Sequence, residues 1–180
     1  GAPIVLRPAL ANARKPDVLV VASSTGGPQA LQQFLAPIAG KISQPILIVQ
    51  HMPATFTAIL AEHLQQALKI PCAEARHDEP VLGGRIYIAP GDWHMRIVRR
   101  GVTNHIALDQ GPQVNYCRPA ADPLFETASS VWRDRVLGVV LTGMGQDGRI
   151  GSEAIVANGG RILAQDEASS VVWGMPGAVA

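Results

Sequence analysis

Short, uninterrupted runs of apolar residues recur along this chain and constrain its fold more than any other feature. Runs of this length, bounded by turn residues, are typical of strands that are buried on both faces of a sheet. The sequence therefore predicts strands at residues 18–22, 46–49, 85–89, 136–142 and 161–164.

Helical patterns separate these runs, with apolar residues three or four positions apart at residues 28–38, 55–68, 120–132 and 152–158. Alternating strands and helices with right-handed crossovers predict a doubly wound, mostly parallel sheet with helices on both faces, a three-layer, Rossmann-like α/β fold. Residues 94–108 differ in pattern and predict a hairpin, either attached to the sheet or at its edge.

Composition agrees with this class and excludes others. The chain is 47% hydrophobic but only 4% aromatic, which indicates an aliphatic core, and its net charge of +1 comes from scattered basic residues. Nucleic acid is therefore not an expected partner, and no sustained apolar stretch predicts membrane insertion. The two cysteines, Cys72 and Cys117, lack the spacing of a disulfide framework or metal site, so we expect inert free thiols.

We expect one domain at residues 17–180, preceded by a leader or linker remnant at residues 1–16. The remnant has no convincing signal-peptide pattern, so a cytoplasmic location is the default expectation. Pro176 is suited to opening a final helix close to Ala180, and we expect that a terminal segment has been trimmed there.

Ser24 follows the first predicted strand and precedes a helix, within Ser23-Ser24-Thr25-Gly26-Gly27-Pro28. This pattern is close to a nucleophile elbow, in which a tight turn lifts a serine hydroxyl above the sheet edge. Backbone N–H groups after Ser24 would then face a developing oxyanion. The alternative is that Ser24 or Thr25 only caps the helix.

His51 follows the second predicted strand, which we expect to lie beside the strand of Ser24. An imidazole titrates near neutrality, so it can remove a proton from a serine hydroxyl and return it to a leaving group. A histidine with a purely structural role is the alternative at this position.

Asp147 lies in the glycine-rich segment 141–148 that follows another buried strand. Its carboxylate could orient an imidazole and stabilise its charged form. A plain turn, a cap for the helix near Ser152, and a phosphate-binding loop are alternatives, although the segment lacks the lysine of a phosphate loop.

Together these three residues predict more than each does alone. Parallel strands place the loops at their carboxyl ends along one edge, so Ser24, His51 and Asp147 are expected to meet as the triad of a serine hydrolase. No metal or organic cofactor is required for this chemistry. The chain order Ser, His, Asp differs from that of α/β-hydrolases.

Further motifs occur in order along the chain: 24–28 Ser-Thr-Gly-Gly-Pro, 50–53 Gln-His-Met-Pro, 87–92 Tyr-Ile-Ala-Pro-Gly-Asp, 94–95 His-Met, 117–119 Cys-Arg-Pro with Asp122 and 124–125 Leu-Phe, 141–145 Leu-Thr-Gly-Met-Gly, 164–168 Ala-Gln-Asp-Glu-Ala and 174–176 Gly-Met-Pro. The chain from about Val18 to Ala178 resembles the catalytic domain of bacterial chemotaxis protein-glutamate methylesterases of the CheB type.

The resemblance implies hydrolysis of methyl esters on glutamates of chemoreceptor cytoplasmic helices, often with deamidation of receptor glutamines. It implies the same triad, and places Thr25 and Met144 in the active site, where they would shape the oxyanion pocket. Arg118 resembles the family's Arg-Pro turn, with a substrate-facing role or a structural ion pair as alternatives. Family members usually carry a receiver domain before this one, so a receiver domain or chemotaxis kinase outside this chain is an expected partner.

Other functions remain open from the sequence: a non-enzymatic adaptor that docks on receptor helices, or an esterase acting on small molecules. A nucleotide-binding protein is the weakest alternative, because neither G-x-G-x-x-G nor a Walker motif follows a strand.

Overall fold

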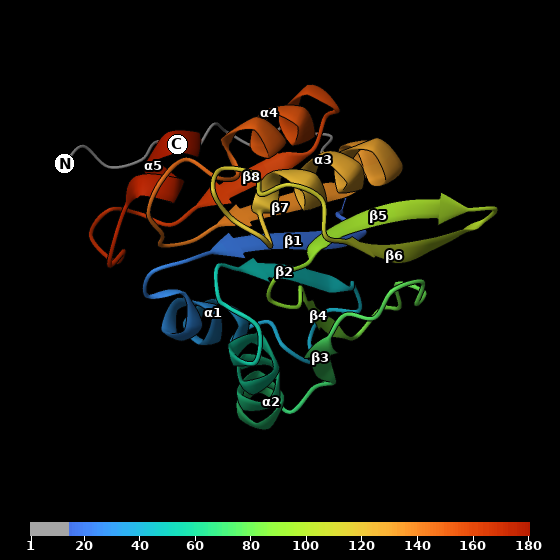
Figure 1. Cartoon of the computed structure of the whole chain (residues 1–180), viewed down its shortest axis with the longest axis horizontal. Coiled ribbons are helices and arrows are strands. Elements are labelled where there is room, and N and C mark those ends of the chain that lie inside the picture. Colours follow the sequence, from blue (N-terminus) through green and yellow to red (C-terminus); the bar gives the residue numbers. More distant parts are fainter. Residues whose placement is uncertain (1–14) are drawn as a thin grey trace.

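A computed structural model describes residues 15–180, and in it a six-stranded sheet lies between two layers of helices (Figure 1). The strand order is β3-β4-β2-β1-β7-β8 and every pairing is parallel. The predicted doubly wound fold is therefore confirmed. The expected remnant at residues 1–16 falls almost wholly outside the described residues.

The strands are β1 (Val18–Ser23), β2 (Ile46–Gln50), β3 (Cys72–Glu74), β4 (Ile86–Ile88), β7 (Val136–Val140) and β8 (Arg161–Ala164). Alternation along β1 shows how the sheet supplies both cores: Val18, Val20 and Ala22 face one apolar cluster, while Leu19 and Val21 face the other. Burial on both faces explains why the inner strands of the sheet are continuous apolar runs. The expectation of burial on both faces is wrong for β8, an edge strand that is only partly buried.

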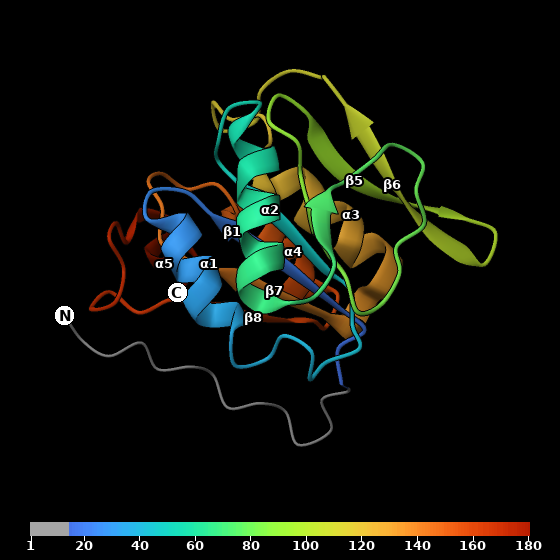
Figure 2. The same cartoon turned by 90° about the horizontal axis from the view of Figure 1, so that it is seen from below.

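Helices α1 (Gly27–Leu35) and α2 (Phe56–Leu68) cover one face, and α3 (Ala121–Trp132), α4 (Arg149–Ala157) and α5 (Gly174–Val179) lie on the other (Figures 1 and 2). Leu31 and Leu64 anchor the first layer, and Phe125 and Ile155 anchor the second. Among residues 15–180, no helix combines the length and apolar character needed to cross a membrane.

The predicted hairpin is present as β5 (His94–Arg100) and β6 (Thr103–Asp109). It forms a separate two-stranded sheet and not an extension of the main one. Met95 and Ile97 are buried in the same apolar cluster as Phe125 of α3, and the Thr127 hydroxyl of α3 accepts a hydrogen bond from the backbone N–H of Ile97. The hairpin therefore extends the layer that contains α3.

The chain leaves β1 through α1 toward β2 on one side, whereas β7 pairs with β1 on its other side. The strand order thus reverses at β1, and such a switch point opens a crevice at the carboxyl ends of the strands. The loops after β1, β2 and β7 carry Ser24, His51 and Asp147, so the topology brings the three predicted catalytic residues to one place.

Candidate active site

His51 and Asp147 are joined directly, although 96 residues separate them in the sequence. The Nε2–H of His51 donates to Oδ2 of Asp147 over 2.6 Å, and the two side chains are only 11% and 2% exposed. Because a carboxylate only accepts hydrogen bonds, Nε2 carries the proton and the lone pair of the neutral imidazole lies on Nδ1. The Asp147 carboxylate therefore fixes the tautomer of His51.

Nδ1 of His51 lies 3.6 Å from the sulfur of Cys117. Cys72 is buried, in agreement with an inert thiol. Cys117 differs from that expectation, because it is partly exposed and contacts the candidate base. Nothing in the cysteine spacing could have indicated this contact, because it depends on how the loop before α3 folds.

Ser24 lies at the same edge, directly after the strand that pairs with that of His51. The backbone N–H of His51 donates to the carbonyl of Ser23, 3.0 Å away, and the N–H of Ser24 donates to the carbonyl of Thr142. Within residues 15–180, however, the Ser24 hydroxyl makes no hydrogen bond. The structure brings Ser24 to the rim of the candidate site but joins only His51 and Asp147 by side-chain contact.

The two helix-cap alternatives do not apply. The N-cap of α1 is Gly26, at φ 78°, and no side chain caps the helix, so neither Ser24 nor Thr25 has that role. Asp147 does not cap the nearby α4 either; its carboxylate accepts from the backbone N–H of Ala121, at the start of α3.

Two buried carboxylates, Asp147 and Asp122, cap the N-termini of two neighbouring helices at this site. Asp147 precedes α4 but accepts from the first turn of α3, while Asp122 in α3 accepts from the backbone N–H groups of Gly148 and Gly151 at the start of α4. Each carboxylate thereby satisfies N–H groups that lack intrahelical partners and lies at a positive helix end. This reciprocal capping fixes Asp147 against the core.

The charges at the site follow from these contacts. Burial acts to raise the pKa of Asp147, but its hydrogen bonds from His51, Ala121 and Asn115 and the charge of His51 outweigh burial and hold the pKa below its usual value. Burial acts to lower the pKa of His51, but the contacts and charges of Asp147 and Cys117 prevail and raise it to about 9. Burial and the neighbouring Asp147 raise the pKa of Asp122, against the lowering effect of its hydrogen bonds from Gly151, Asn115 and Gly148.

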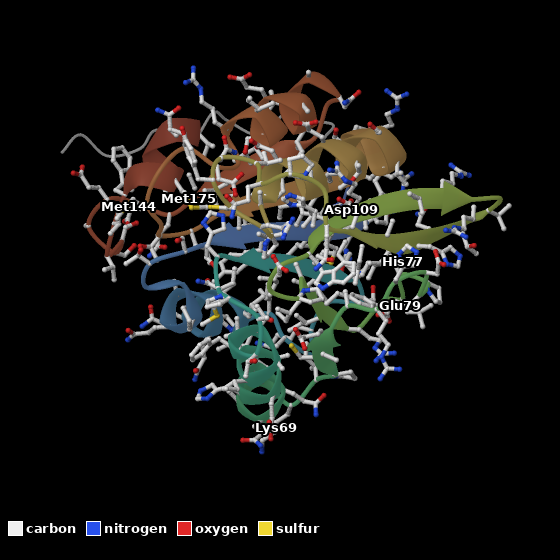
Figure 3. All side chains as sticks on the ribbon, viewed as in Figure 1. Lys69, His77, Glu79, Asp109, Met144 and Met175 are labelled. Carbon is white, nitrogen blue, oxygen red and sulfur yellow. The ribbon has the colours of Figure 1, made fainter. Side chains whose placement is uncertain are left out.

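The predicted oxyanion residues lie at the rim. Thr25 is exposed, and Met144 is 68% exposed at the end of the molecule toward which β1 and β7 point (Figures 1 and 3). The backbone N–H groups of Thr25 and Met144 have no acceptor within residues 15–180, whereas that of Gly143 donates to the carbonyl of Val172. The Gly143 N–H is therefore already occupied and is not free for an oxyanion.

Arg118 has a structural role. Its guanidinium pairs with Asp92 and donates to the carbonyls of Gln110 and Gly111. The ion-pair alternative for this residue is therefore confirmed. Within the described part of the chain, no group of three or more His, Cys, Asp or Glu side chains could hold a metal ion.

Gln50 supports the backbone of the candidate nucleophile, a role that the sequence did not indicate. Its buried amide accepts a hydrogen bond from the Ser23 hydroxyl and donates to the carbonyl of Ser24 over 2.8 Å. A Cβ on Gly27 would lie 1.9 Å from Oε1 of Gln50, so the glycine at the start of α1 leaves the space that this amide fills.

Replacing Gln50 by leucine is expected to lower the free energy of unfolding by about 2 kcal/mol, because a buried hydroxyl and a carbonyl lose their partners. Denaturant unfolding measures this change, and Gln33→Leu on the exposed side of α1 is the matched control, expected to stay within about 0.5 kcal/mol of the parent. Equal stability of the two variants would contradict a supporting role for Gln50.

Known proteins resemble this chain closely. The family model described as "CheB methylesterase" matches residues 19–180. A protein-glutamate methylesterase/protein-glutamine glutaminase of Bradyrhizobium diazoefficiens is 58% identical over 92% of this chain, and one from Caulobacter vibrioides is 57% identical over 91%. These matches cover 42% and 48% of the two relatives, so the chain spans less than half the length of either.

The fold agrees with a solved structure as well. The crystal structure of the Thermotoga maritima CheB methylesterase catalytic domain superimposes with a TM-score of 0.87 and 36% sequence identity, covering 92% of this chain and 88% of that one. Together with the family model, which spans most of the chain, this establishes that the chain belongs to the CheB methylesterase family.

Proposed function

We propose that residues 17–180 form the catalytic domain of a protein-glutamate methylesterase. Its substrates are methyl-esterified glutamates on the cytoplasmic helices of chemoreceptors, and receptor glutamines are deamidated at the same site. The family and the names of the relatives support this proposal. The observation that carries it is the buried His51–Asp147 pair at the strand edge where Ser24 emerges.

Ser24 is the nucleophile of this reaction and Nδ1 of His51 is the base. For the Ser24 hydroxyl to donate to Nδ1, the Cys117 sulfur must yield its place on that nitrogen, and the proposed route is rotation of the Ser24 and Cys117 side chains between staggered rotamers. Hydrogen bonds of this kind are often loose without substrate and tighten when it binds. Substrate binding thus completes a triad of which half is already assembled.

In the first half-reaction, Oγ of Ser24 attacks the γ-carbonyl carbon of the ester while its proton passes to Nδ1 of His51. The tetrahedral intermediate collapses, and the methoxy group takes that proton and leaves as methanol. Water then gives a proton to Nδ1 and attacks the acyl-enzyme, and the returning proton restores the Ser24 hydroxyl as glutamate leaves. With glutamine, the first leaving group is ammonia.

The oxyanion of each tetrahedral intermediate is stabilised by backbone donors at the rim. Thr25 and Met144 provide N–H groups without other acceptors in the described residues, and they follow the strands on either side of the switch point. Preorganised donors of this kind contribute most where water is excluded. The side chains of Thr25 and Met144 shape the entrance to this pocket.

The proposed substrate class also determines the cellular location and the partners of the enzyme. Receptor helices on the inner side of a membrane require a cytoplasmic enzyme, and a receiver domain or chemotaxis kinase outside this chain is a further proposed partner. Neither nucleic acid nor membrane insertion has a part in this proposal.

The test is release of methanol from a radiolabelled, methylated receptor fragment, with ammonia release measured on the corresponding glutamine fragment. Methanol release together with a phosphonate adduct mapped to Ser24 would support the proposal. A receptor fragment that binds but keeps its methyl groups would indicate an adaptor, and preference for small methyl esters that compete with the receptor would indicate a general esterase.

The rate of this reaction is expected to depend on pH through His51. The base must be neutral, and its pKa is raised to about 9, so kcat/KM should rise about tenfold per pH unit below about 9 and level off above it. Steady-state kinetics with a p-nitrophenyl ester measures the profile. A midpoint near the usual value of 6.5 for histidine would contradict a tight His51–Asp147 pair in the free enzyme.

A further inference from the structure

Asn115 lies in a tight turn beside the candidate triad. Val114 and Cys117 exchange both of their backbone hydrogen bonds, 3.0 and 2.9 Å long, and the two residues between them are left-handed, with φ 52° at Asn115 and φ 62° at Tyr116. Asparagine tolerates this backbone region better than most residues. Asn115 and Tyr116 are both exposed residues, but the Asn115 amide is directed at the two carboxylates, whereas the Tyr116 side chain is almost fully exposed.

The Asn115 amide joins the two carboxylates that cap α3 and α4. Its Nδ2 donates one hydrogen bond to Oδ1 of Asp147 and one to Oδ2 of Asp122, each 2.8 Å long. An amide nitrogen carries two hydrogens, so both are used. The other oxygen of Asp147 accepts from His51, which makes Asn115 the link between the buried Asp122 and the catalytic pair.

The shared donor offsets the repulsion between the Asp147 and Asp122 carboxylates. Two buried carboxylates close together repel one another, and one of them would ordinarily take up a proton. A donor shared between them favours the charged form of both and restrains rotation of the Asp147 carboxylate toward another rotamer. Rotation matters because Oδ2 of Asp147 must stay 2.6 Å from Nε2 of His51 to hold the imidazole.

We propose that Asn115 is a positioning residue of the reaction, which keeps the Asp147 carboxylate aligned on His51 by bridging it to Asp122. This inference rests on the proposed function for the identity of the reaction. The same role of Asn115 would apply to any reaction in which His51 acts as a base. Asn115 does not touch the reacting atoms and acts only through Asp147.

The experiment compares Asn115→Gly with Tyr116→Gly. Glycine adopts left-handed backbone readily, so both variants keep the turn, but only the first removes an amide from the carboxylates. The probe is p-nitrophenyl acetate, which reports acylation of Ser24 without a receptor. For Asn115→Gly we expect kcat to fall about ten- to a hundredfold with KM unchanged within about twofold, because a small misalignment near the reacting groups costs that much.

The pH profile is the second readout, since a purely structural residue would leave it in place. In Asn115→Gly the imidazolium loses a firmly held partner, so the midpoint of the acylation profile should fall by about half a pH unit or more. Tyr116→Gly should keep the parent midpoint and rate within about twofold. Parent-like kinetics in Asn115→Gly, or equal losses in both variants, would overturn the proposal.

A measurement on the unaltered chain covers the case in which Asn115→Gly does not fold. Both side-chain amide protons of Asn115 should exchange slowly with solvent, and their NMR shifts should follow the titration of His51; exchange at the rate of a free amide would overturn the proposal. If the parent chain is acylated by p-nitrophenyl acetate but leaves receptor methyl esters intact, the proposed function fails while the role of Asn115 is still decided by the two variants.

Discussion

Replacing Ser24 by alanine is expected to lower the turnover of receptor methyl esters by about four orders of magnitude or more, because the acyl-enzyme can no longer form. Stability should change little, within about 0.5 kcal/mol, since the Ser24 hydroxyl makes no hydrogen bond in the described residues and lies at a partly exposed rim. Methanol release and denaturant unfolding measure the two effects on the same preparation.

Ser130→Ala is the matched control for this variant. Ser130 is exposed on α3, and its hydroxyl bonds only to the backbone carbonyl of Glu126 in the same helix, so activity and stability should both match the parent. The structure also identifies the alternative outcome. If Ser24→Ala kept more than about a hundredth of the parent turnover while Cys117→Ala lost it, the thiol beside Nδ1 of His51 would be the nucleophile.

Most of the sheet could be predicted from the sequence because its inner strands are buried on both faces, and continuous apolar runs record that burial directly. The strand β3 (Cys72–Glu74) was missed for the opposite reason. It is a three-residue edge strand in which only Cys72 is buried and Ala73 is exposed, so it contains neither an apolar run nor a clear alternation. Its existence depends on pairing with β4, a tertiary contact.

The candidate triad could be predicted because parallel topology converts strand order into proximity, and the loops of Ser24, His51 and Asp147 each follow a recognisable strand. The residues that surround the triad could not be predicted in this way. Asn115 reaches Asp147 through a left-handed turn in the segment between β6 and α3, where no periodic pattern exists. Asp122 and Asp147 cap each other's helices, and local sequence rules assign a cap only to its own helix.

Asp147→Asn should be the most informative change at the buried end of the relay, because every contact of this carboxylate comes from a donor. Oδ2 accepts from His51 and from the backbone N–H of Ala121, and Oδ1 accepts from the Asn115 amide and from the backbone N–H of Asp122. In either orientation, an amide turns its NH2 group toward N–H donors. Buried donors then lose their acceptor, at a cost of about 1–3 kcal/mol in the free energy of unfolding.

The chemical effect of Asp147→Asn should be larger than the loss of stability. If the amide NH2 faces His51, it favours the tautomer whose proton lies on Nδ1, and that nitrogen can no longer accept the proton of Ser24. Turnover should fall by about four orders of magnitude, as expected for a triad with the wrong tautomer. The surviving activity should show a lower pH midpoint, because His51 loses the carboxylate whose hydrogen bond and charge raise its pKa.

Steady-state kinetics across pH, with unfolding measured in parallel, separates these effects, and Asp134→Asn is the matched control at an exposed position outside the site. A stable Asp147→Asn variant with parent-like turnover would show that His51 needs no carboxylate, and the proposed relay would be wrong. A variant that loses stability but keeps turnover would assign Asp147 to helix capping alone. Loss of turnover beyond the loss of folded protein is the result that a catalytic role requires.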